Sequence, residues 1–207
     1  MRTTLLLCLF AGILPAQSFT LGVKGGVQLT DDIDSPYADS ETKRYVGGPS
    51  ATIGLPAGFR LELDALYRHA AFRSSFGNVF GYSTERDRGN SWEFPIILRH
   101  GIGHGLYVGV GYAPRVITGD AHINVAQLLP VAFFQSNRDG QWDTTHGVIG
   151  AAGFEKHVGP LRIGPEVRYT FWTSSALDVN GSQGYFVRSS QHQVDILIGI
   201  HVPIGGR

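Results

Sequence analysis

The sequence predicts an all-β protein: an eight-stranded, antiparallel, up-and-down transmembrane β-barrel. Three observations predict it. Segments of about ten residues alternate between apolar and polar positions, the connections between them alternate between long and short, and one segment, Leu161 to Trp172, has an apolar face and a charged face. Successive side chains of a strand point to opposite faces, and a membrane barrel is apolar outside and polar inside.

The segment from Leu161 to Trp172 shows this pattern most clearly. One face carries Leu161, Ile163, Pro165, Val167, Tyr169 and Phe171, and the other carries Arg162, Gly164, Glu166, Arg168 and Thr170. The polar face is charged along most of its length, and the apolar face ends in aromatic residues. This combination favours a membrane strand with an aromatic side chain at the lipid boundary.

The N-terminal residues predict a secretion signal. Arg2 supplies a positive charge, Leu5 to Leu14 form a short apolar run, and Ala16-Gln17-Ser18 fits a cleavage site. The run is shorter than the ~20 residues of a membrane-spanning helix. We therefore expect residues 1–18 to be a signal peptide and residues 19–207 to form the barrel domain. Cys8 is the only cysteine, so the mature chain has no disulfide.

Composition excludes two other classes. The chain has 17 basic and 17 acidic residues. The sequence has no cluster of basic residues of the kind that would indicate a nucleic-acid partner. After the signal, no segment approaches the ~18 consecutive apolar residues of a transmembrane helix. The 28 glycines suit tight turns and the narrow interior of a barrel.

Eight strands are expected along the chain. They are Phe19–Leu29, Arg44–Leu55, Phe59–Phe72, Asn90–His100, Gly105–Ile117, Thr144–Val158, Leu161–Trp172 and Gln191–Val202. The long loops between them are Thr30–Lys43, Arg73–Gly89, Thr118–Asp143 and Thr173–Ser190, and short turns fall near Ala57, Gly103 and Gly159. Outer-membrane barrels have short periplasmic turns and long outside loops. An even strand number then places both chain ends on the periplasmic side.

The middle of the longest loop, Ile123 to Phe134, is apolar. We expect this stretch to pack on the rim of the barrel. The alternative is a surface for a ligand or partner.

The signal, the eight strands, the short turns and the sequence GPLRIGPEVRYTFW resemble the small outer-membrane β-barrel family that includes OmpX-like and OmpA-like barrels. The resemblance covers Phe19 to Ile204. It implies a bacterial outer-membrane location, with outer-membrane lipids, lipopolysaccharide and the barrel assembly machinery as partners. It also allows an extracellular partner at the long loops. Such barrels usually end on an aromatic residue, whereas this chain ends Pro203-Ile204-Gly205-Gly206-Arg207.

The polar strand faces predict a charged lumen. Its basic residues are Lys24, Arg60, Arg68, Arg99, Arg115, Arg162 and Arg168, and its acidic residues are Glu62, Asp64, Glu93, Glu155, Glu166 and Asp195. An isolated buried charge costs several kcal/mol, so these groups must pair. An eight-stranded barrel has just enough room for its own side chains. We therefore expect an ion-paired plug, centred on the third and seventh strands, whose charges meet across the interior.

This interpretation favours a structural or surface-interaction role, without enzymatic activity, cofactor or metal. The eight histidines show no HxH or HExxH spacing. One alternative is a lipid-modifying enzyme, similar to the lipid A deacylases and acyltransferases among small barrels. The residues that could form its catalytic site are histidines near the outer strand ends (His69, His146, His192) and nearby serines (Ser74, Ser75, Ser189, Ser190). No G-x-S-x-G motif is present. A narrow channel is the other alternative.

Overall fold

The computed structural model describes residues 18–31, 38–78, 81–128, 131–174, 178–180, 186–188 and 190–204. The expected signal peptide lies almost wholly outside these residues. The strands of the barrel are β1 (Phe19–Gln28), β3 (Lys43–Gly54), β4 (Phe59–Asp64), β5 (Leu66–Asn78), β6 (Gly81–Glu93), β7 (Ile96–Gly103), β8 (Leu106–Leu128), β9 (Val131–Phe154), β10 (Lys156–Val158), β11 (Leu161–Trp172) and β14 (His192–Ile204).

These segments make eight barrel strands, because β4 continues into β5, β6 into β7, and β9 into β10. Each barrel strand pairs antiparallel with the next, and β1 pairs with β14 to close the cylinder. Val23, for example, lies opposite Pro49 on one side and Ile200 on the other. The predicted eight-stranded antiparallel barrel is therefore confirmed.

The short connections and both ends of the barrel sequence lie at one end of the cylinder. Phe19 pairs with Ile204 and Ile53, next to the 3-10 turn η2 (Pro56–Gly58). The turns after β7 and β10 lie at this same end, and His104 and Gly159 in them adopt positive φ. We call this the short-turn end, and the opposite one the hairpin end.

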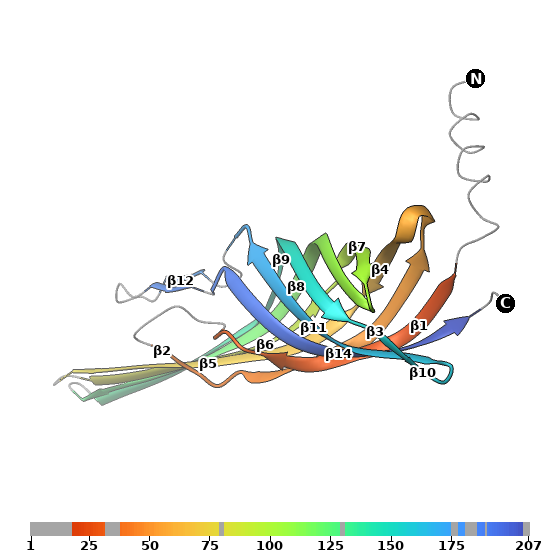
Figure 1. Ribbon diagram of the computed structural model, residues 1–207. Helices are drawn as coiled ribbons and strands as arrows, with labels where there is room; N and C mark the ends of the chain where they lie inside the picture. Colours follow the sequence, from red (N-terminus) through yellow and green to blue (C-terminus); the bar gives the residue numbers. More distant parts are fainter. Residues whose placement is uncertain are drawn as a thin grey trace, which may run out of the picture.

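Two of the four predicted loops are strands instead. The β5–β6 ladder runs through Arg73–Gly89 up to the pair Asn78 and Gly81, and the β8–β9 ladder runs through Thr118–Asp143 up to Leu128 and Val131. Since β6 also pairs with β8 along this length, the hairpins form a four-stranded sheet that projects beyond the barrel (Figure 1). Both faces of this projection lie outside the cylinder, so alternation of apolar and polar residues, the signature of a half-buried strand, is absent from its sequence.

The apolar stretch Ile123 to Phe134 forms the far end of the β8–β9 hairpin, with Val125 opposite Phe134. It is therefore strand and not loop, and it lies at the far end of the projecting hairpin instead of on the rim of the barrel, where it was expected. Residues 129 and 130 lie outside the described part of the chain. The other two predicted loops are described only in part. β2 (Ala38–Ser40) pairs with β5, and β12 (Asp178–Asn180) pairs with β13 (Phe186–Arg188).

The two faces of the barrel have inverted polarity. Large apolar side chains are exposed on the outside, among them Leu21, Val23, Leu63, Ile96, Leu98, Val108, Val110, Val148, Val167, Ile196, Ile198 and Ile200. The buried interior is mostly polar or charged, with small apolar groups around Ile97 and Leu197. No helix in the described ranges has the length and apolarity needed to cross a membrane.

Candidate functional site

The strands point all thirteen predicted lumen residues into the barrel, because each occupies an inward position of the alternation. Ten are buried: Lys24, Glu62, Asp64, Arg68, Glu93, Arg99, Arg115, Glu166, Arg168 and Asp195. The remaining three, Arg60, Glu155 and Arg162, are partly exposed at the short-turn end. Along the axis these residues form three groups.

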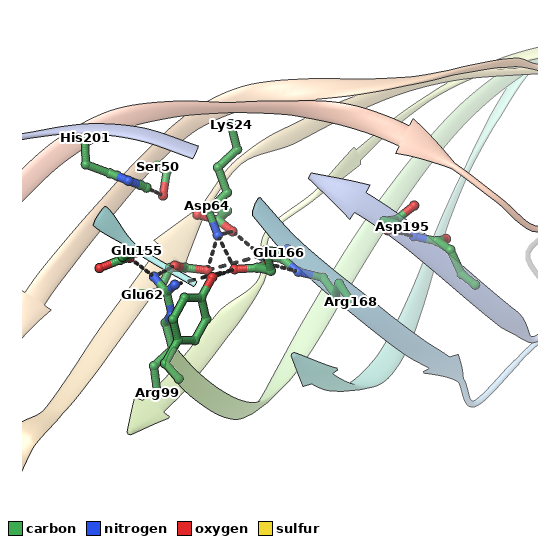
Figure 2. A network of polar contacts seen from close by, with 12 residues as sticks. Lys24, Ser50, Glu62, Asp64, Arg99, Glu155, Glu166, Arg168, Asp195 and His201 are labelled. Atoms are coloured by element: carbon green, nitrogen blue, oxygen red, sulfur yellow. Dashed lines mark hydrogen bonds and ion pairs between the residues drawn. The ribbon is translucent and has the colours of Figure 1, made fainter. Parts of the chain in front are cut away.

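The central group is built around Arg168 on β11. Its Nη2 lies 2.6 Å from Glu166, 2.8 Å from Asp64 and 3.1 Å from Glu62, and the side chain is only 1% exposed. β11 and β4 occupy opposite positions in the eight-stranded cylinder. The charges of the third and seventh strands therefore meet across the interior, as Figure 2 shows.

Two further cations complete the central group. Lys24 on β1 places its Nζ 2.6 Å from Glu62 and 2.9 Å from Glu166. Arg99 on β7 places its Nη1 2.5 Å from Glu62. Three cations thus face three carboxylates. The central group carries no net charge and each charge has a partner, which matters because an unpaired buried charge is costly.

Tyr107 on β8 supports this group, a role that was not predicted from the sequence. The Arg99 guanidinium lies 3.4 Å from the centre of the Tyr107 ring, which is a cation–π contact. The Tyr107 hydroxyl donates a hydrogen bond of 2.8 Å to Glu166. Its inward position in the alternation was the only sequence signal that could have found it.

The second group lies toward the hairpin end. Arg68 is 2.6 Å from Asp195 and 2.8 Å from Glu93. The Arg115 guanidinium lies 3.8 Å from the centre of the Trp172 ring and 3.9 Å from Glu93. Two cations and two carboxylates therefore balance here.

Trp172 narrows the lumen at the same level. Its side chain is fully buried, and its indole N–H donates a 3.0 Å hydrogen bond to Gln193. Gln193 in turn donates to Asp195 at 2.9 Å. The bulky ring is thereby fixed inside the cylinder, a role that was not predicted from the sequence.

The third group, at the short-turn mouth, holds Arg60, Arg162 and Glu155. Arg60 Nη1 lies 2.5 Å from one oxygen of Glu155, and Arg99 reaches the other oxygen at 3.0 Å. Within the described part of the chain, Arg162 forms no ion pair, and its buried Nε has no hydrogen-bond partner. A small cavity of about 10 Å³ lies between this mouth and the central group, which is room for about one water molecule.

The histidines considered for an enzymatic site lie on the outer surface near the hairpin end. His146 is hydrogen-bonded to the Tyr112 hydroxyl at 2.5 Å, and His192 to the Tyr169 hydroxyl at 2.7 Å. His69 is hydrogen-bonded to the Asn90 side chain at 2.9 Å. These rings thus bond tyrosine or asparagine side chains.

The nearby serines do not complete a nucleophilic site where they are described. The Ser190 hydroxyl bonds the backbone of His192, not its ring. The side chains of Ser74, Ser75 and Ser189 lie outside the described set. The serine–histidine pair that is seen, Ser50 and His201 at 3.1 Å, is buried inside the barrel. Among the residues described, no three His, Cys, Asp or Glu side chains gather as a metal site.

Comparison with known proteins finds similar barrels but no sequence family. No family model matches the chain, and no curated protein sequence matches it. The chain is an eight-stranded antiparallel β-barrel. Its strand pairings establish that fold directly.

Solved structures similar to this chain are of low sequence identity. Neisserial surface protein A is 12% identical, with 92% of this chain and 100% of that chain covered and a TM-score of 0.41. CarO2 of Acinetobacter baumannii is 13% identical, with 91% and 100% covered and a TM-score of 0.39. The outer membrane protease OmpT of Escherichia coli is 9% identical, with 91% and 96% covered and a TM-score of 0.41.

Proposed function

We propose that the protein is an outer-membrane barrel with a closed lumen that acts through its surface, either by supporting the membrane or by contacting a partner outside the cell. The observation that carries this proposal is the inverted polarity of the cylinder. Its outer face is apolar around the circumference, and its interior is mostly polar or charged, with the buried charged side chains held in ion pairs.

Lipid is the environment that suits the outer face. Val110 is 68% exposed, and apolar surface in water costs roughly 25 cal/mol per Å². β1 has 10 residues and β11 has 12, close to the ~9–11 that a tilted membrane strand needs. Exposed aromatic residues lie toward both ends of this belt, with Tyr45, Trp92, Tyr112 and Tyr169 toward the hairpin end and Phe59 and Phe154 toward the short-turn end. Aromatic girdles of this kind mark the two membrane interfaces.

The filled interior supports a closed barrel. Arg168 and Lys24 hold the central carboxylates in ion pairs of 2.6–3.5 Å, and Trp172 is buried above them toward the hairpin end. A solute path would require these pairs to separate in a poorly hydrated space, where an unpaired charge is costly.

The projecting sheet supports contact with a partner. β8 has 23 residues, about twice the length needed to span the membrane, so its excess extends roughly 40 Å at ~3.3 Å per residue. β9 pairs with β11 only over residues 147–153. Between residues 131 and 145 its other edge has no paired strand in the described chain, and an open strand edge can accept a further strand.

Epitope tags test the orientation that this proposal requires. Tags inserted after Asn78 and after Leu128 should bind antibody on intact cells, because both positions lie at the ends of the projecting hairpins. A tag after Gly103, at the short-turn end, should bind only after the outer membrane is permeabilised. Binding to the Gly103 tag on intact cells would contradict the orientation.

Lipid profiling tests the role itself. Cells with and without the gene should show the same acylation of phospholipid and lipopolysaccharide. Changed acylation would replace the structural or surface role with the lipid-modifying alternative.

A trimmed variant separates membrane support from surface contact. Gly119 lies opposite Gln141, so joining them through an Asn-Gly turn removes the far part of the β8–β9 hairpin and leaves the barrel. Restoration of detergent resistance by the trimmed barrel would indicate membrane support. Loss of cell adhesion with normal detergent resistance would indicate surface contact.

A further inference from the structure

The short-turn mouth of the lumen carries an uncompensated positive charge. We propose that this mouth binds a phosphate-type oxyanion between Arg162 and Arg60. The site is distinct from the hairpin surface.

The distribution of charge along the axis locates the excess. The central group holds three cations and three carboxylates, and the hairpin-side group holds two of each. The mouth holds two arginines, Arg60 and Arg162, but one carboxylate, Glu155. The lumen has seven cations and six carboxylates, so its single excess charge lies at the mouth.

The pairing of Glu155 assigns that excess to Arg162. One Glu155 oxygen lies 2.5 Å from Arg60, and the other lies 3.0 Å from Arg99. Both carboxylate oxygens are therefore engaged by other guanidinium groups. Among described residues, Arg162 has no ion pair, and its Nε is buried without an acceptor.

The mouth is open to solvent, unlike the other two groups. The Arg60 side chain is 37% exposed, and Arg162 is partly exposed. The guanidinium of Arg60 repels the charge of Arg162, and the carboxylate of Glu155 attracts it. An anion between the two guanidinium groups would relieve that repulsion and could accept a hydrogen bond from the Arg162 Nε–H group, which has no acceptor.

The donors select the chemistry of the anion. A guanidinium group presents its N–H groups as a planar fork that bonds two oxygens of a phosphate or carboxylate. Two forks suit an ion with several oxygens and more than one negative charge. Phosphate meets both conditions, as a free ion or as the end of a larger molecule, whereas chloride offers no pair of oxygens.

The test uses the full chain folded in detergent micelles. Inorganic phosphate is titrated calorimetrically at constant ionic strength, with sodium chloride as the balancing salt. We expect saturable binding of one phosphate per chain, and at least a tenfold weaker affinity in Arg162→Gln. The matched control is Arg44→Gln, which removes an exposed arginine paired with Asp31 at the hairpin end and should leave the affinity unchanged.

Two results would contradict the proposed phosphate site. One is phosphate binding that chloride displaces equally well at equal ionic strength, since that describes a diffuse ion atmosphere. The other is equal affinity in the wild type and Arg162→Gln. If Arg162→Gln fails to fold, Arg60→Gln tests the same pair and should also weaken binding at least tenfold.

A parallel titration with glycerol 3-phosphate separates the two sources of this chemistry. Tighter binding than inorganic phosphate would assign the site to the end of a larger phosphorylated molecule. Weaker binding would assign it to the free ion.

Discussion

Arg168 and Arg162 lie on the same inward face of β11, yet their surroundings are opposite. Arg168 is 1% exposed and lies within 3.1 Å of three carboxylates. Arg162 is partly exposed, and no carboxylate of the described chain pairs with it. Residue type and strand phase are shared, so the difference comes from the neighbouring side chains. Arg168 has Glu166 on its own strand and Glu62 and Asp64 on β4 across the barrel.

This difference shows that two levels of the same narrow lumen have different properties. In the middle, opposite walls supply matching charges, and the result is a closed plug. At the short-turn mouth the opposite wall supplies another arginine, Arg60, and water can enter. Substitutions in the two regions should therefore differ both in their effect on stability and in their effect on binding.

The largest effect is expected for Arg168→Leu. Without the Arg168 guanidinium, three buried carboxylates are left with only two cations, Lys24 and Arg99. The carboxylates are those of Glu62, Asp64 and Glu166. Breaking a buried pair costs about 3–5 kcal/mol, and the free energy of unfolding, measured by urea titration in lipid vesicles, should fall by that amount. The control Arg44→Gln removes an exposed pair and should change it by less than about 1 kcal/mol.

A slightly smaller effect is expected on the outer face. Ile198→Arg places a cation in the middle of the apolar belt, where the cost is about 2–4 kcal/mol. Val202→Arg, close to the short-turn end, should cost about 0–1 kcal/mol in the same assay. Equal costs at the two positions would contradict a belt immersed in lipid.

A double-mutant cycle measures the central pairing directly. Glu166→Ala and Arg168→Ala should each lower the free energy of unfolding, while the double variant should cost less than the two losses added. The coupling should fall between about 0.5 and 3 kcal/mol. Strict additivity would mean that the 2.6 Å contact between these residues contributes nothing.

The smallest effect is expected for Arg162→Gln. Because the side chain is partly exposed and makes no ion pair in the described structure, the free energy of unfolding without phosphate should change by less than about 0.5 kcal/mol. A loss close to that of Arg168→Leu would show that Arg162 belongs to the plug.

The alternation of the sequence predicted what depends on strand phase. The seventh strand runs from Leu161 to Trp172 in prediction and structure alike, and the residues predicted to face inward do so. Which face a side chain occupies can be read from the strand's own sequence, because every second side chain of a strand points to the same face.

Features that depend on neighbouring strands were not predictable in the same way. The sequence predicts loops at Arg73–Gly89 and Thr118–Asp143, because strands that project beyond the barrel need not alternate between apolar and polar residues. The roles of Tyr107 and Trp172 depend on which side chains lie across the lumen. The excess of one cation was countable from the sequence, but its assignment to Arg162 required the pairing of Glu155 with Arg60 and Arg99.

Single-channel recording in planar lipid bilayers tests the central claim, a lumen closed by its own ion pairs, most directly. The folded wild-type chain should give negligible conductance, because the central group and Trp172 fill the cylinder. Arg168→Ala should show brief openings, since it removes the cation that joins the opposite walls. A steady, large current through the wild-type protein would contradict the closed lumen and would favour the channel alternative.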